Sequence, residues 1–286
     1  MQLALGTMTF GREAGERESR RIFEAAYEGG IRIYDTAPTY GYGASERILG
    51  DCLASVDRTT VRVMTKWGYD AAETDVEASL EGSMARLRTD YIDTLFCHRF
   101  GCRSPVARSK ALEEMRRMDE GGLINYIGLS NCAAWQVAAN AFILAEIAAI
   151  QPMYSLVKRQ AEVELLPVAD DYDLTAYGYS PLGSGVLVSD HALENRDERY
   201  KQRYMGAINR AQTFKLMELA NRLEVPRAAV AVAWVALRDV IPIIGASNVG
   251  QLNQSLQARR IKELPMGELD EIFPPPPPAH DRPDDA

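Results

Sequence analysis

Short apolar runs and longer amphipathic segments alternate along the chain. The apolar runs are rich in β-branched residues and end at polar or glycine-containing turns, a pattern typical of buried strands. They predict eight strands, over residues 3–5, 31–34, 61–65, 92–97, 126–129, 148–151, 174–177 and 241–244. The segments between them repeat their apolar positions with the period of an α-helix. They predict helices over residues 18–28, 45–54, 76–87, 111–120, 133–144, 163–171, 213–223 and 227–237.

Glycine and proline mark the ends of several of these helices. The pairs Gly29-Gly30 and Gly121-Gly122 follow two helical patterns directly, and glycine accepts the positive φ that stops a helix. Pro226 precedes the last helical pattern, where its fixed φ suits a helix start. These signals support helices between the predicted strands.

The regular order of strand and helix predicts an α/β fold, because parallel strands need crossover helices to join them. Eight such units can close into a single (β/α)8 TIM barrel. The alternative, an open doubly wound sheet, commonly carries Gly-x-Gly-x-x-Gly after its first strand, whereas here Gly41 to Glu46 follows the second strand and ends in glutamate. We predict one barrel over residues 1–273 and a proline-rich, disordered tail over residues 274–286.

Composition and charge exclude several classes of partner. Hydrophobic residues make up 47% of the 286 residues, and the net charge of −8 repels nucleic acid and anionic membranes. No apolar run approaches the roughly 18 residues of a membrane span, and the first residues lack the basic and apolar segments of a secretion signal. The sequence therefore predicts a cytoplasmic protein that binds neither nucleic acid nor membrane; it carries no signal for an oligomeric state.

The four cysteines do not form a recognisable metal motif. Cys97, His98 and Cys102 lie close in the sequence, but no Cys-x-x-Cys pair accompanies them. Reduced, partly buried thiols are the simpler interpretation, so no metal site is predicted.

Polar residues follow the predicted strands at a regular spacing. Asp35, Lys66, His98 and Ser130 are separated by 31, 32 and 32 residues, about one strand-helix unit each. Because the carboxyl ends of parallel barrel strands meet at one end, closure would bring these side chains around one pocket.

The segments that hold these residues resemble the catalytic signatures of the aldo-keto reductase family. They read IYDTAPTYG over 33–41, MTKWG over 64–68 and LFCHR over 95–99. Further likeness comes from GLSN over 128–131, QPMYS over 151–155, YSPLGSGVL over 179–187 and IIGASN over 243–248. The resemblance implies reduction of an aldehyde or ketone to an alcohol by hydride transfer from a nicotinamide cofactor. The positions that match the family's catalytic tetrad are Asp35, Tyr40, Lys66 and His98.

Each tetrad residue suits that chemistry. Hydride arrival at the carbonyl carbon places negative charge on oxygen, which a proton donor, here Tyr40, neutralises. A tyrosine with a pKa near 10 is a weak acid at neutral pH, but a cationic Lys66 lowers that value. Asp35 would hold Lys66, and His98 would orient the carbonyl.

The resemblance also implies the cofactor contacts. Ser130, Asn131 and Gln151 would bind the nicotinamide carboxamide, and Tyr179 would stack on its ring. Further matching positions, which would lie along the two phosphate groups, are Ser180, Leu182, Gly183, Ser184, Gly185, Gly245, Ser247, Gln251 and Ser255. NADP(H) is favoured over NAD(H), although relatives that prefer NADPH often carry arginine near position 247 and asparagine at position 255. Arg199, Lys201 and Arg203 are substitute cations if their segment covers the cofactor, with a solvated charged face as the alternative.

The substrate pocket and two other functions are further expectations. Aromatic or sulfur-containing side chains near strand ends are candidate pocket walls: Met8, Phe10, Trp67, Tyr69 and Phe100. A nucleotide-binding regulatory subunit, similar to the reductase-like subunits of potassium channels, is one alternative function. A cofactor-independent isomerase or lyase on the same barrel is the other.

Overall fold

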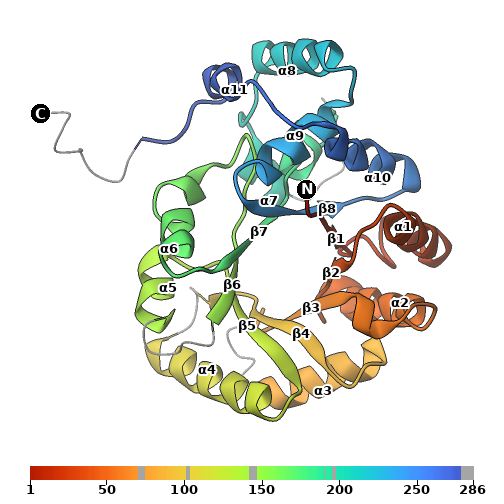
Figure 1. The fold of residues 1–286 in the computed structure, drawn as a ribbon, viewed down its shortest axis with the longest axis vertical. Helices are drawn as coiled ribbons and strands as arrows, with labels where there is room; N and C mark the ends of the chain where they lie inside the picture. The colour runs from red at the N-terminus through yellow and green to blue at the C-terminus, as the bar shows by residue number, and fades with distance from the viewer. Residues whose placement is uncertain (70–74, 101–103, 142–146, 190, 195–197, 278–286) are drawn as a thin grey trace, which may run out of the picture.

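The computed structural model is a closed barrel of eight parallel strands (Figure 1). It describes residues 1–69, 75–100, 104–141, 147–189, 191–194 and 198–277. Each strand pairs with the next in chain order, and the first strand closes the ring on the eighth, so the predicted barrel is confirmed. The strands are β1 (Ala4–Gly6), β2 (Ile33–Asp35), β3 (Arg62–Trp67), β4 (Ile92–Cys97), β5 (Ile124–Ser130), β6 (Ile147–Gln151), β7 (Thr175–Tyr179) and β8 (Val240–Gly245).

Helices surround this barrel on its outer side (Figure 1). The helices at predicted positions are α1 (Glu16–Glu28), α2 (Ala44–Leu53), α3 (Val76–Leu87), α4 (Pro105–Glu120), α5 (Ala134–Ala141), α6 (Leu165–Asp171), α8 (Arg210–Arg222) and α9 (Arg227–Ala236). Residues 142–144 of the fifth predicted helix lie outside the described residues. The predicted ends of α1 and α4 at glycine pairs are confirmed, since both helices stop just before the pair and Gly30 and Gly122 have φ of 80° and 72°.

Three described helices and one helix start differ from the sequence prediction. The helices α7 (Glu198–Tyr204), α10 (Val249–Leu256) and α11 (Met266–Ile272) are not among the predicted amphipathic segments, because each has at most eight residues, about two helical turns. Helix α4 begins six residues earlier than predicted, since the Ser104 hydroxyl accepts a hydrogen bond from the Ala107 amide.

Side chains fill the interior of the barrel. A buried apolar cluster takes one residue from most of the strands: Ala4, Ile33, Met64, Phe96, Ala149, Tyr177 and Ile243. Gly128 in β5 gives Phe96 its space, because a Cβ there would lie 2.3 Å from the Phe96 ring. The packed interior supports the polar residues at the carboxyl ends of the strands, which we call the rim.

The chain beyond β8 returns along the outside of the barrel. The buried Arg159 donates hydrogen bonds to the Asp270 carboxylate and the Phe273 carbonyl, which ties α11 to the barrel. Residues 274–277 form no helix or strand, and residues 278–286 of the predicted tail lie outside the described residues. None of the helices in the described part of the chain is long and apolar enough to cross a membrane.

Candidate active site

A buried ion pair joins the ends of β2 and β3 at the rim. The Lys66 Nζ lies 2.6 and 2.7 Å from the two carboxylate oxygens of Asp35, and it donates a third hydrogen bond of 2.9 Å to the Thr36 carbonyl. The Gln151 amide donates to the same carboxylate over 2.8 Å. Both charged side chains are buried, so the pair is stable only because these partners replace water. Burial lowers the pKa of Lys66, and the Asp35 carboxylate opposes that shift.

Tyr40 and His98 stand beside this pair. Tyr40 opens a short 3-10 turn after β2, and the Lys66 Nζ lies 5.0 Å from the centre of its ring. The His98 ring, at the end of β4, meets the Tyr40 ring edge-on with 6.0 Å between the ring centres. Tyr40 is partly exposed at the rim. The structure therefore brings together the four side chains that match the catalytic tetrad.

His98 is held as a neutral imidazole. Burial, followed by the positive charges of Lys66 and Arg99, lowers the pKa of His98 to about 2. A neutral ring both donates and accepts hydrogen bonds, whereas an imidazolium ring only donates. At neutral pH His98 can therefore orient a carbonyl oxygen without supplying a full positive charge.

We expect His98 to make the folded protein sensitive to acid. Since its pKa is about 2 when folded and about 6.5 when unfolded, only the unfolded state binds this proton between those values. The free energy of unfolding should therefore fall by about 2 kcal/mol more between pH 7 and pH 5 in the wild type than in His98→Gln. Urea unfolding at both pH values measures the difference, with His191→Gln as control because that side chain is 78% exposed. Equal losses in wild type and His98→Gln would contradict the neutral imidazole.

Two residues in the first turn of α2 fix the segment that carries Tyr40. The Ser45 hydroxyl bonds to the Thr36 hydroxyl over 2.9 Å and donates to the Thr7 carbonyl over 2.7 Å. The fully buried Glu46 accepts hydrogen bonds from the Thr65 hydroxyl, next to Lys66, and from Arg86. Sequence reasoning missed both residues, although a glutamate on the apolar face of the predicted helix was a readable signal.

The residues predicted to bind the carboxamide form one hydrogen-bonded group beside the tetrad. Asn131 donates to the His98 carbonyl over 2.7 Å and accepts from the Tyr179 hydroxyl over 2.9 Å. Ser130 donates to the Gln151 carbonyl over 2.9 Å. The hydroxyl and amide groups of this set match the donor and acceptor atoms of a carboxamide, and the partly exposed Tyr179 ring offers a flat surface.

The segment predicted to bind pyrophosphate is a tight turn after β7. Four residues of this turn have positive φ, between 55° and 99°: Ser180, Gly183, Ser184 and Gly185. A Cβ at Gly183 would lie 2.8 Å from a Val157 methyl carbon, so glycine is required there. The Gly183 and Gly185 amides donate within the turn. Helix α7, with the exposed Arg203, packs against this turn, whereas the Arg199 side chain lies outside the described residues.

A carboxylate lies at the start of α10, beside positions that the sequence predicts along the cofactor phosphates. Glu18 accepts a 3.1 Å hydrogen bond from the Val249 amide at the start of α10. The Gln251 side chain accepts from the Ser247 amide over 2.8 Å, and Gly245 is exposed beside them. Ser255 is fully buried, so it presents no surface to a ligand in this structure.

Three of the five predicted pocket walls belong to the hydrophobic core. Phe10, Trp67 and Phe100 are at most 1% exposed, because their rings pack between the barrel and its surrounding segments. In this structure they present almost no surface to a ligand, and their place in the pocket stays a prediction. Met8 is partly exposed and Tyr69 is 37% exposed, with its ring 5.0 Å from that of His98.

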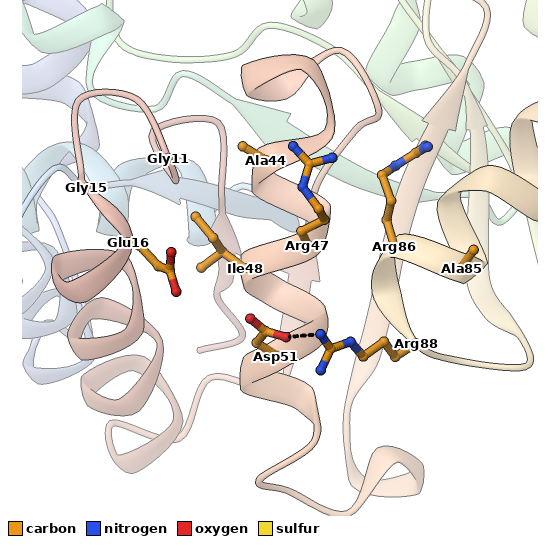
Figure 2. A pocket seen from close by; sticks show the side chains of 10 residues that line it. All are labelled: Gly11, Gly15, Glu16, Ala44, Arg47, Ile48, Asp51, Ala85, Arg86 and Arg88. Atoms are coloured by element: carbon orange, nitrogen blue, oxygen red, sulfur yellow. Dashed lines mark ion pairs between the residues drawn. The ribbon is translucent and has the colours of Figure 1, made fainter.

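A cavity of about 710 Å³ lies away from this site, on the outer surface between α1, α2 and α3 (Figure 2). Its charged walls include Glu16, Arg47, Asp51, Arg86 and Arg88. Arg88 points across it to Asp51, and their side chains form an ion pair of 2.7 Å. None of the tetrad residues lines it, so its size is not evidence about the rim.

Comparison with known proteins places the whole barrel in one family. The model of the aldo/keto reductase family matches residues 2–273. The chain belongs to this family. It is 32% identical to an uncharacterized oxidoreductase, YrpG, of Bacillus subtilis, with 96% of this chain and 93% of the relative covered. It is 30% identical to a probable voltage-gated potassium channel subunit beta of rice, Oryza sativa, with 90% and 87% covered.

A solved structure has the same fold. The aldo-keto reductase of Klebsiella pneumoniae, determined in complex with NADPH, superimposes with a TM-score of 0.80 at 24% identity. The superposition covers 96% of this chain and 91% of that protein. It supports the barrel architecture of this family member.

Proposed function

We propose that this protein reduces an aldehyde or ketone to an alcohol with a nicotinamide cofactor, and that Tyr40 is the general acid. The observation that carries the proposal is the buried Asp35–Lys66 pair beside the rings of Tyr40 and His98. A buried cation near a phenol favours the phenolate, which makes the phenol a better proton donor. Membership of the aldo/keto reductase family supports the same reaction class.

Each side chain has a separate part in the proposed reaction. A nicotinamide cofactor, when bound, would supply the hydride for the carbonyl carbon. Tyr40 donates its phenolic proton to the carbonyl oxygen, and Lys66 stabilises the phenolate that remains. Asp35 holds Lys66 in place through two short hydrogen bonds. The neutral His98 hydrogen-bonds to the carbonyl oxygen and orients it.

The cofactor would lie along the rim from β5 to β8. Ser130, Asn131 and Gln151 would hold the carboxamide, and Tyr179 would stack on the ring. Family resemblance and the NADPH in the Klebsiella pneumoniae protein favour NADP(H) over NAD(H). Ser247 in place of arginine and the Glu18 carboxylate at the start of α10 oppose a 2′-phosphate there.

Fluorescence titration with NADPH and with NADH tests the cofactor, because three tryptophans supply the signal. We expect binding of at least one nucleotide and its oxidation with members of a panel of aldehydes and ketones. The affinity ratio then decides between the two cofactors. Failure to bind either nucleotide would overturn the proposal, and product formation without nucleotide would favour an isomerase or lyase.

A regulatory role is the second candidate, because the rice relative is described as a probable channel subunit. Tight nucleotide binding without turnover of any carbonyl compound would support that role. The assembled tetrad favours the enzyme, since a subunit that only binds nucleotide has no need for a proton donor. A cytoplasmic location is part of the same proposal.

A further inference from the structure

Arg99 lies at the rim directly after His98. Its guanidinium carbon is 4.0 Å from the centre of the Tyr69 ring, and its Nη2 donates a 2.9 Å hydrogen bond to the Tyr69 hydroxyl. The Tyr69 ring also meets the His98 ring edge-on, with 5.0 Å between the ring centres, so the Arg99–Tyr69 contact lies next to the proposed catalytic groups. Arg99 is half-buried, so it is held in place and still reaches solvent.

Among the described residues, no carboxylate pairs with Arg99. Within the described part of the chain it forms no ion pair, although two other partly buried arginines do, Arg58 with Asp93 and Arg86 with Glu46. Lys66, the other cation beside His98, is paired with Asp35. Arg99 therefore places a positive charge next to the proposed catalytic groups that no described carboxylate compensates, in a protein whose net charge is −8.

We infer that Arg99 and Tyr69 form a subsite for a carboxylate carried by the substrate, so that the preferred substrates are carbonyl compounds with an acid group. A guanidinium has five N–H donors, and the Tyr69 hydroxyl uses one of them, which leaves donors for a carboxylate. A single uncompensated charge matches a carboxylate better than a phosphate, which carries up to two. This inference rests on the proposed reductase function.

Stacking on Tyr69 alone is the competing role for Arg99. In that case, replacing Arg99 would lower kcat/KM by the same factor for charged and neutral substrates. A subsite for a carboxylate instead changes the selectivity between charged and neutral substrates of the same shape. The ratio of two kcat/KM values therefore separates the two roles.

The test compares 4-carboxybenzaldehyde with its neutral analogue methyl 4-formylbenzoate. We expect the wild type to prefer the acid, and Arg99→Gln to lower the ratio of kcat/KM for acid over ester by roughly 10- to 100-fold, mainly through KM. Arg117→Gln, at an exposed arginine in the last turn of α4, is the control and should keep the wild-type ratio. A parallel loss for both aldehydes in Arg99→Gln, or no preference in the wild type, would overturn the subsite.

Equilibrium binding of benzoate and benzamide tests the subsite without turnover. Saturation-transfer NMR should show benzoate binding to the wild type about tenfold more tightly than to Arg99→Gln. The affinity for the neutral benzamide should be the same in both proteins. If neither aldehyde is reduced, the reductase proposal fails while this measurement still decides the subsite. Equal benzoate affinity in both proteins would refute it.

Discussion

Replacing Tyr40 by phenylalanine is expected to lower kcat for carbonyl reduction about a thousandfold. The variant keeps the aromatic ring that packs against His98 and Lys66, and loses only the hydroxyl that would donate the proton. Nucleotide affinity should stay near the wild-type value, because Tyr40 is not among the residues proposed to hold the cofactor. Steady-state rates with an aldehyde, together with the fluorescence titration, measure both quantities.

Tyr42→Phe is the matched control for this substitution. Tyr42 lies two residues further along the same turn, but its side chain is 96% exposed. Removal of its hydroxyl should leave kcat within about twofold, since it contacts no reacting group. If Tyr40→Phe reduced carbonyls as fast as the wild type, another group would have to supply the proton.

The second large effect concerns stability, because Asp35 and Lys66 form a buried pair. Removing one partner leaves the other charge buried without its counter-ion, and we expect Asp35→Leu or Lys66→Met to lower the free energy of unfolding by about 3–5 kcal/mol. The double variant should be more stable than either single variant, because no uncompensated charge then remains. Urea unfolding of the four proteins gives the coupling energy as a double-mutant cycle.

An exposed ion pair supplies the comparison. Lys110 and Glu114 of α4 lie 3.7 Å apart, with the lysine side chain 70% exposed, so their coupling should be below about 0.5 kcal/mol. Additive losses at Asp35 and Lys66 would mean that the two charges do not depend on each other. That outcome would also weaken the proposed effect of Lys66 on Tyr40.

The separation between the rim and the outer cavity affects how the molecule is probed. The cavity between α1, α2 and α3 is roomy, yet its charges include the Asp51–Arg88 pair and it contains none of the tetrad (Figure 2). At the rim, the charged and titratable side chains Asp35, Lys66 and His98 are buried, and burial of this kind shifts pKa values at functional sites. Ligands should therefore be tested first against residues of the rim.

Local pattern was sufficient to predict the barrel, whereas the tetrad positions were predicted from the resemblance to the aldo-keto reductase family. Each strand is an apolar run bounded by turns, and each long helix repeats its apolar positions, so burial itself imposes the periodicity that the chain shows. The regular spacing of Asp35, Lys66 and His98 follows from the repeated strand-helix unit. Short helices such as α10 escaped because eight residues contain only about two turns of that period.

The sequence by itself determined the fold class, the order of the strands and the rim positions, since these depend on periodicity within single segments. Tertiary structure alone decided which side chains near the strand ends are exposed. Phe10 and Phe100 follow strand ends as Tyr69 does, yet they are buried in the core. The Glu18 contact with α10 joins positions 231 residues apart, and the Arg99–Tyr69 contact joins two separate loops. Such contacts depend on how segments pack after the barrel closes, and no local period encodes that packing.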